Sequence, residues 1–250
     1  MTLSLFQDGD KEQSVLEKEE LCPGAVVLRH FARSRQAEIL DALHVVTAEA
    51  SFRHMITPGG FRMSVALTNC GSCGWVSDQT GYHYDAVDPE SGKLWPSMPV
   101  VLLKLAREAA ASAGFENYQP DACLINRYEP GAPLSLHQDR NELDFDAPIV
   151  CVSLGLTAIF LWGGSRRADK PVRIPLWHGD VMAWGGPARL RYHGILPIKE
   201  GYHSFAGRLS DQSDVSQGGL MVAHERARAQ SASTGYVCVP GQPFGAQDLL

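Results

Sequence analysis

The pattern of apolar residues divides the chain into a helical first part and a strand-rich second part. In the first part, apolar residues recur near helical spacing from Ser34 to Ala50 and from Leu94 to Ala113, and Gly114 closes the second stretch. This spacing places apolar side chains on one face, so it predicts two amphipathic helices. Extended runs are predicted at 21–30, after a Pro-Gly turn, and at 62–68.

From Asp121 onward the chain consists of short apolar runs broken by Gly and Pro. Six or more such runs, at a spacing of roughly 8–12 residues, are typical of a β-sandwich or barrel. We therefore predict an α+β chain, mainly β, folded as a double-stranded β-helix (jelly roll) with two buttressing helices. Residues 1–20 are expected to form a mobile arm, 21–202 a single domain, and 203–250 a divergent, partly disordered tail.

The segment from Asn126 to Asp139 contains the first candidate for chemistry, the pair His137-x-Asp139. Residues two apart on a strand point to the same face. One imidazole and one carboxylate on one face form two thirds of the facial triad that binds Fe(II) and leaves three positions open. His193, on a late apolar run, is the best candidate for the third ligand. The alternative interpretation is a surface strand with two polar residues.

A second His-x-Asp pair, His178-Gly179-Asp180, lies between two strand-like runs. The glycine between its members favours a turn. Only 13 positions separate Asp180 from His193, little more than one hairpin, whereas 56 positions separate His137 from His193. The longer separation leaves room for intervening strands, so we favour His137, Asp139 and His193 as the metal-binding set.

Composition excludes several classes of protein. No apolar run approaches the roughly 20 residues of a membrane helix, and the N-terminus lacks the pattern of a secretion signal. Six cysteines without a framework spacing indicate a cytoplasmic protein, and Cys70-x-x-Cys73 is interpreted as a turn with free thiols rather than a redox motif. The net charge of −6 argues against nonspecific coating of nucleic acid. A local basic face remains open, from Arg53, Arg62, Arg166, Arg167, Lys170 and Arg173.

Several motifs together resemble the AlkB family of Fe(II)/2-oxoglutarate-dependent DNA-alkylation repair dioxygenases. They are P-D-A-C-L-I-N-R-Y-x-P-G-A-x-L-S-L-H-Q-D, A-P-I-V-x-V-S-L-G-L, H-G-D-V-x-x-W-G-G and R-L-x-Y-H-G-I, and the similarity runs from about Phe52 to Pro197. The resemblance implies that His137, Asp139 and His193 bind iron. It also implies that Asn126 and Tyr128 hydrogen-bond 2-oxoglutarate.

The resemblance further implies how the substrate is bound. Trp75 and Tyr82 correspond to contacts around a flipped-out base, and Asn141 and Arg167 fall at substrate-contacting positions. Without the resemblance, ordinary packing is the favoured interpretation of Trp75 and Tyr82. The family usually has an acidic residue in place of Asn141, which puts the base preference in question.

The implied activity is oxidative demethylation of N-alkylated bases of the 1-methyladenine or 3-methylcytosine type, a DNA-repair reaction. It uses Fe(II), 2-oxoglutarate and oxygen and releases succinate, carbon dioxide and formaldehyde. The expected partner of this monomer is alkylated single- or double-stranded DNA, or RNA. A base must leave the stack to reach buried iron, and a single strand or a lesion-weakened duplex costs least to open. A protein or small-molecule hydroxylase on the same scaffold is a further alternative.

The C-terminal part departs from the family pattern. Where the family has an R-x-N-x-T-x-R strand, whose arginines pair with the distal carboxylate of 2-oxoglutarate, this chain has S-D-Q-S-D-V-S from Ser210 to Ser216. The codons TCG-GAT-CAA-TCT-GAC-GTT-TCG, chosen from the degenerate sets, can encode this segment. Read one base later, they encode Arg-Ile-Asn-Leu-Thr-Phe-Arg. We therefore hypothesise that the chain from about His203 is a frameshifted translation; the alternative interpretation is a real, divergent C-terminus.

The missing arginines suggest an alternative function. An unpaired buried carboxylate costs on the order of several kcal/mol, and Arg208 lies at a different register. The hypothesis predicts poor binding of 2-oxoglutarate and the loss of one core strand of the jelly roll. The alternative to an active enzyme is thus an impaired remnant that binds metal and nucleic acid.

Overall fold

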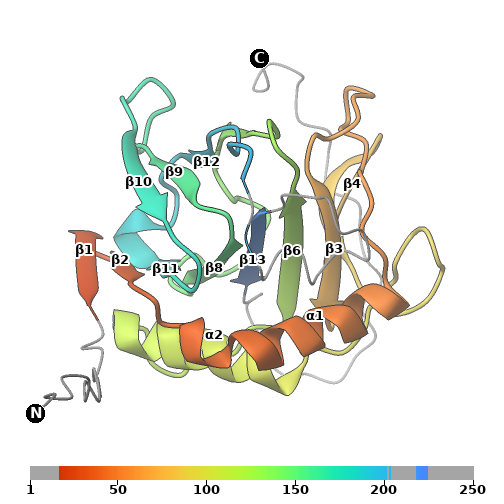
Figure 1. Cartoon of the computed structure of the whole chain (residues 1–250). Coiled ribbons are helices and arrows are strands. Elements are labelled where there is room, and N and C mark those ends of the chain that lie inside the picture. The colour runs from red at the N-terminus through yellow and green to blue at the C-terminus, as the bar shows by residue number, and fades with distance from the viewer. Residues whose placement is uncertain (1–16, 202, 204–217, 225–250) are drawn as a thin grey trace, which may run out of the picture.

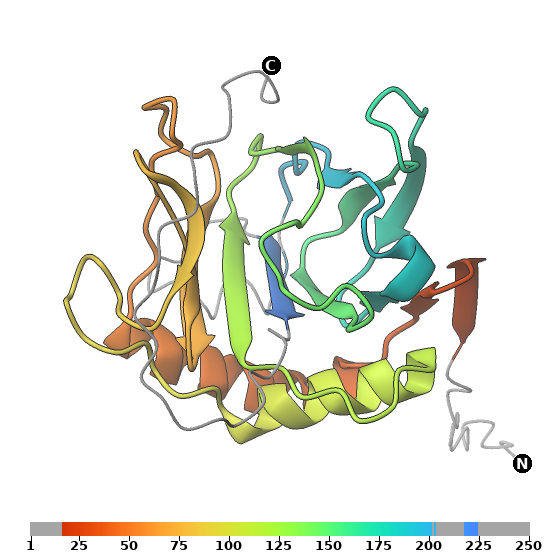
Figure 2. The ribbon, with the colours of Figure 1, turned by 180° about the vertical axis from the view of Figure 1, so that it is seen from behind.

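The computed structural model describes residues 17–201, 203 and 218–224. Two helices, α1 (Gln36–Glu49) and α2 (Val100–Ala113), lie side by side along one face of a large antiparallel sheet (Figures 1 and 2). A smaller sheet lies on the opposite side of the large sheet from the helices. This is the predicted jelly roll buttressed by two helices.

The large sheet has seven strands in the order β1-β2-β11-β8-β13-β6-β3. Their bounds are β1 (Lys18–Cys22), β2 (Ala25–Leu28), β11 (Val181–Trp184), β8 (Ile149–Gly155), β13 (Gly218–His224), β6 (Ala122–Tyr128) and β3 (Ala66–Gly71). The smaller sheet has the order β10-β9-β12-β7. Its strands are β10 (Val172–Leu176), β9 (Ala158–Trp162), β12 (His193–Ile195) and β7 (Leu134–His137). Two short 3-10 helices are η1 (Arg33–Arg35) and η2 (Gly186–Ala188).

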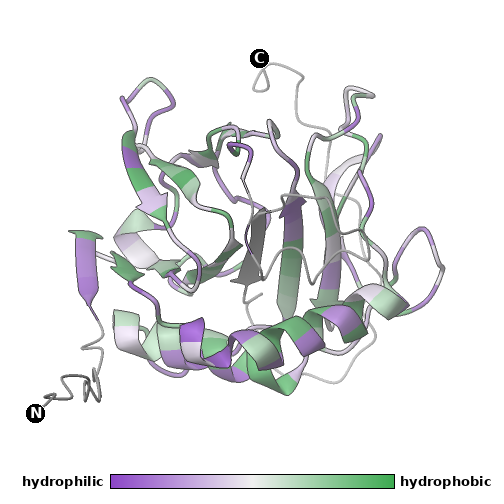
Figure 3. Cartoon of the chain, in the orientation of Figure 1, coloured by the Kyte–Doolittle hydropathy of each residue, from purple (hydrophilic) through white to green (hydrophobic). Residues whose placement is uncertain are grey.

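The two faces of the large sheet pack against two different hydrophobic cores, as strand β8 shows. All seven of its residues are buried, because the strand is covered on both faces. Val150 and Val152 pack with residues of the helices, whereas Ile149 and Cys151 pack with Phe160 and other residues of the smaller sheet. This alternation follows from the two-residue period of a strand. Figure 3 shows the contrast at the sheet edge, where hydrophilic β1 lies beside hydrophobic β2.

Both helices were predicted, and the second begins later than expected. Helix α2 starts at Val100 with Pro99 as its N-cap, because prolines at 96 and 99 keep the preceding residues extended. Gly114 closes the helix as predicted, in a left-handed conformation with φ 97°. The strand expected at 62–68 forms at 66–71 instead, because Ile56 and Arg62 pair across a short loop before it.

Residues 74–85, which are rich in Gly and aromatic residues, form a third, two-stranded sheet that was not predicted from the sequence. It consists of β4 (Gly74–Asp78) and β5 (Gly81–Asp85). The turn is stabilised by the carboxylate of Asp78, which accepts hydrogen bonds from the backbone N–H and the hydroxyl of Thr80. The hydrogen bond from the Thr80 hydroxyl lowers the pKa of Asp78, and Gly81 supplies the positive φ that follows the turn.

The expected loss of a core strand was wrong. Strand β13 lies between β8 and β6, with Gly218 opposite Tyr128 and Met221 opposite Val152. The N–H and C=O groups of β6 and β8 need partners in the sheet interior, and a backbone can satisfy them whatever its side chains. The proposed frameshift and the segment from Ser210 to Ser216 lie outside the described residues, apart from His203 and β13.

Two local interpretations of the sequence are confirmed. His178 and Gly179 form a turn, and Asp180 is fully buried in an ion pair of 2.7 Å with Arg29. Cys70 and Cys73 flank the turn between β3 and β4 as buried thiols, and Cys238 lies outside the described residues. Within the described part of the chain, neither helix is long and apolar enough to cross a membrane.

Candidate metal centre

The smaller sheet brings together the three residues that the sequence singled out as metal ligands. His137 ends β7 and lies directly opposite His193 of β12, and Asp139 follows two positions later. One ligand atom from each of the three residues lies within 4.8 Å of the others. The carboxylate oxygens of Asp139 lie 3.4 Å from Nε2 of His137 and 3.4 Å from Nε2 of His193.

Backbone carbonyls hold both imidazoles with Nε2 directed at this cluster. Nδ1 of His137 lies 2.8 Å from the carbonyl oxygen of Ser135, and Nδ1 of His193 lies 3.1 Å from that of Arg191. A carbonyl oxygen only accepts, so each Nδ1 donates its hydrogen, and Nε2 is the ring nitrogen left to bind a metal. The other ring nitrogen of a metal-binding histidine is typically hydrogen-bonded in this way.

Burial and neighbouring charges set the protonation of the cluster. Burial raises the pKa of Asp139, but the nearby His193 and His137 rings outweigh it and hold the pKa well below its usual value. Burial lowers the pKa of His137, and the hydrogen bond with Asp139 more than offsets it. His193 is further restrained by Phe160, which stacks on it at 5.8 Å, and by Trp184 at 5.0 Å. One ionised carboxylate and two imidazoles, with both Nε2 atoms directed at that carboxylate, form a donor set that fits an Fe(II) ion.

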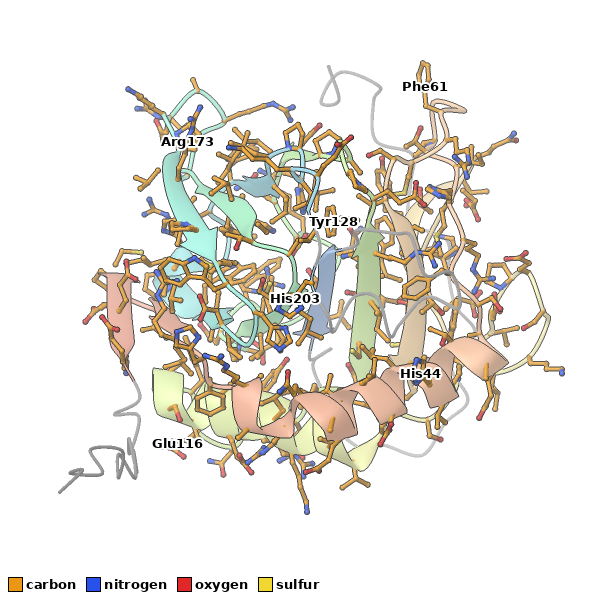
Figure 4. All side chains as sticks on the ribbon, viewed as in Figure 1. His44, Phe61, Glu116, Tyr128, Arg173 and His203 are labelled. Carbon is orange, nitrogen blue, oxygen red and sulfur yellow. The ribbon has the colours of Figure 1, made fainter. Side chains whose placement is uncertain are left out.

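The residues expected to bind 2-oxoglutarate lie on β6 of the large sheet, and Tyr128, labelled in Figure 4, packs with residues of the smaller sheet. Tyr128 is buried, and its hydroxyl has no hydrogen-bond partner among the described residues. Burial raises the pKa of Tyr128, so this hydroxyl stays protonated and can donate. Asn126, two positions earlier, is also buried. A buried donor without a partner is costly, and a carboxylate of a bound co-substrate would satisfy it.

The residues expected to contact a base gather at the β4–β5 hairpin. The rings of Trp75 and Tyr82 stack at 5.5 Å with an angle of 16° between planes. The side-chain amide of Asn141 donates to the carbonyl oxygen of Tyr82 at 3.1 Å, which brings the segment after Asp139 to the hairpin. Arg167 lies apart from them in the exposed loop between β9 and β10.

A buried polar network next to the cluster was missed by the sequence analysis. Arg189 donates from Nη1 to the carbonyl oxygen of Asp139 at 2.9 Å, and its Nη2 lies 3.0 Å from Glu142. The hydroxyl of Tyr84 donates to the same carboxylate at 2.8 Å. Burial, followed by the charge of Glu142, raises the pKa of Tyr84 well above its usual value. These residues are far apart in sequence, and nothing in their local pattern distinguishes them from surface charges.

Known proteins are similar to this chain in sequence and in fold. The model of the 2OG-Fe(II) oxygenase superfamily matches residues 24–227. The chain is 54% identical over 205 residues to the alpha-ketoglutarate-dependent dioxygenase AlkB of Salmonella typhimurium, covering 82% of this chain and 93% of that protein. It is 51% identical to AlkB of Escherichia coli, with 80% and 91% covered. The nucleic acid dioxygenase ALKBH1 of Homo sapiens is 36% identical over 131 residues, 51% of this chain and 33% of that protein. The structure of OsALKBH1 superimposes with a TM-score of 0.71 at 26% identity, covering 84% of this chain and all of that one.

The fold and the donor set thus define a dioxygenase that uses Fe(II), 2-oxoglutarate and oxygen. Within that superfamily the chain belongs to the AlkB family. The family and the jelly-roll fold were both predicted from the sequence motifs.

Proposed function

We propose that this protein oxidatively demethylates N-alkylated nucleic-acid bases of the 1-methyladenine or 3-methylcytosine type, as a DNA-repair enzyme. The observation that carries the proposal is the convergence of His137, Asp139 and His193, with both Nε2 atoms directed at one carboxylate. In this proposal these three residues bind the iron.

The chain's own residues prepare the site for its co-substrates. The Nδ1 hydrogen bonds of His137 and His193 fix both rings, so the metal meets ligands already oriented. Tyr128 and Asn126 bind 2-oxoglutarate, with the Tyr128 hydroxyl donating to a carboxylate. When bound, iron and 2-oxoglutarate would allow oxygen to oxidise the N-methyl group of the base. The products are succinate, carbon dioxide and formaldehyde.

The substrate end of the site is assigned to the β4–β5 hairpin and two further residues. Trp75 and Tyr82 offer a stacking surface to a base that has left its helix, which offsets part of the unstacking cost. Because the amide nitrogen of Asn141 donates to Tyr82, its amide oxygen is the atom that can accept from an exocyclic amino group of the base. Arg167 in the exposed β9–β10 loop binds a phosphate.

The proposal also includes the nucleic-acid substrate, the oligomeric state and the cellular compartment of the protein. Relatives are named as nucleic acid dioxygenases, and we assign single-stranded or lesion-weakened double-stranded DNA as the substrate, with RNA as a second class. The protein acts as a monomer in the cytoplasm, where a reducing environment keeps thiols such as that of buried Cys70 reduced.

The test is demethylation of an oligonucleotide that carries one 1-methyladenine or 3-methylcytosine. With Fe(II), 2-oxoglutarate and air, the full chain should remove 14 mass units from the oligonucleotide and release one formaldehyde per base. Asp139→Ala should abolish both signals, whereas Arg35→Lys, in an exposed ion pair with Glu108, should leave them unchanged. Absence of product with the unaltered chain, under conditions in which it binds both cofactors, would contradict the proposal.

An impaired metal-binding remnant is the second candidate, favoured by the serines at 210 and 216 in place of arginines. Anaerobic binding of Fe(II) and 2-oxoglutarate distinguishes the two, through the metal-to-ligand charge-transfer absorbance of their complex. A band with tight co-substrate binding supports the active enzyme. Metal binding without the band supports the remnant, and sequencing the gene then tests the frameshift.

A further inference from the structure

The backbone around Asp139 lacks the support that a sheet gives the other two proposed ligands. His137 and His193 are paired with each other across neighbouring strands, and His193 also pairs with Trp162 of β9. Strand β7 ends at His137, so Asp139 lies beyond the ladder. Its orientation therefore has to be held by contacts with side chains.

One buried arginine supplies that contact. Arg189, 1% exposed, follows η2 and donates from Nη1 to the carbonyl oxygen of Asp139 at 2.9 Å. Its Nη2 lies 3.0 Å from the carboxylate of Glu142, which is 5% exposed. The planar guanidinium can serve both acceptors at once, which a lysine ammonium at the end of a flexible stem does not do.

The carboxylate of Glu142 in turn connects this arginine to the β4–β5 hairpin. The Tyr84 hydroxyl donates to Oε1 of Glu142 at 2.8 Å, from the strand that pairs with β4. We infer that Arg189 and Glu142 are positioning residues for the iron ligand Asp139, and that Tyr84 holds Glu142 in place for that purpose. The inference rests on the proposed role of Asp139 as an iron ligand, and it concerns metal binding rather than turnover.

The chain contains a matched control for Arg189. Arg29 is also buried, and its Nη1 also donates to a backbone carbonyl, that of Pro175 at 2.8 Å, and to a buried carboxylate, that of Asp180 at 2.7 Å. Both guanidinium groups lie over an aromatic ring, Trp177 in one case and Phe145 in the other. None of the residues that Arg29 contacts is a proposed iron ligand.

The experiment is anaerobic titration of Fe(II) alone into Arg189→Lys and Arg29→Lys, with thermal unfolding recorded for both. Partners of a metal ligand typically contribute tenfold to hundredfold to metal affinity. We expect Arg189→Lys to bind Fe(II) at least about tenfold more weakly, and Arg29→Lys to stay within about twofold of the unaltered chain. Equal iron affinities of the two variants, whether both normal or both reduced, would overturn the inference.

A double variant separates positioning from stability. Glu142→Leu combined with Arg189→Met removes both buried charges, a replacement that is often neutral or stabilising for a fold. A folded double variant with weakened iron binding supports the inference, and one with normal binding refutes it. Tyr84→Phe should cause a smaller loss than Arg189→Lys, and normal iron affinity in Tyr84→Phe would remove Tyr84 from the network.

A further variant separates failure of this inference from failure of the proposed function. If Asp139→Ala binds Fe(II) as well as the unaltered chain, the assignment of Asp139 as an iron ligand is wrong. If Asp139→Ala loses iron but Arg189→Lys does not, only the positioning role is wrong. The charge-transfer band with 2-oxoglutarate provides a second readout, because a displaced carboxylate ligand alters it.

Discussion

Replacing Tyr128 by phenylalanine should strengthen the fold of the cofactor-free protein and weaken its binding of 2-oxoglutarate. The Tyr128 side chain is buried, and its hydroxyl lacks a hydrogen-bond partner among the described residues. A buried polar group without a partner costs about 1–3 kcal/mol. Removing the hydroxyl should therefore raise the free energy of unfolding of the cofactor-free chain by about 1 kcal/mol, the lower end of that range because a small void remains.

The loss in co-substrate binding follows from the same atom. A hydrogen bond to a charged group contributes about 1.5–3 kcal/mol, and 1.4 kcal/mol corresponds to a tenfold change in affinity. Tyr128→Phe should thus bind 2-oxoglutarate about tenfold to a hundredfold more weakly in the presence of Fe(II).

The assays are urea unfolding of the metal-free chain and anaerobic titration of 2-oxoglutarate into the Fe(II)-loaded chain. Tyr118→Phe is the control, since Tyr118 is buried in the other core, on the helix side of the large sheet. That variant should leave the affinity for 2-oxoglutarate unchanged. The reasoning is refuted if Tyr128→Phe destabilises the metal-free chain while its affinity for 2-oxoglutarate stays normal.

Three further predictions concern other parts of the molecule. A Cβ at Gly194 would lie 2.6 Å from the carbonyl oxygen of Leu134, so Gly194→Ala should push β12 away from β7. This displacement should weaken Fe(II) binding at least about tenfold. An anaerobic Fe(II) titration with normal affinity would contradict this prediction. Base stacking contributes about 1–3 kcal/mol, so Trp75→Ala should raise the KM for a methylated oligonucleotide about tenfold, and an unchanged KM would remove Trp75 from the base site. Burial raises the pKa of Asp88, but hydrogen bonds from Arg53 and other groups outweigh burial and lower this pKa. The Asp88 carboxylate therefore stabilises the fold above the pKa of the unfolded state, and this contribution is lost as the pH falls through the pKa of the folded state. Asp88→Asn should therefore destabilise the protein at neutral pH but not in strong acid, as urea unfolding at the two pH values will show.

Local sequence patterns were sufficient for the helices, the strand-rich second part and the choice of metal cluster. Helical spacing predicted α1 and α2. Strand alternation predicted His137 and Asp139 on one face, and the two do converge, although β7 ends at His137 and Asp139 follows it. The 56 positions between His137 and His193 left room for intervening strands, and the two residues lie opposite each other on β7 and β12. These features depend on periodicity and spacing, and both can be read from a single chain.

Other features were not predicted from these patterns. The start of α2, the β4–β5 hairpin and the position of β13 followed from prolines, a turn and the backbone groups of β6 and β8. The loss of a strand was expected from side chains, because serines at 210 and 216 replace the arginines of the family strand. A sheet, however, is completed by backbone hydrogen bonds.

The sequence by itself therefore determined the helices, the jelly roll, the family and the three candidate ligands. Only the tertiary structure placed Arg189 against the backbone of Asp139 and buried the charge of Glu142 beside it. The physical reason is that a charged residue has the same local pattern whether it is solvated or buried. Its role is decided by the partners that folding brings within hydrogen-bonding distance.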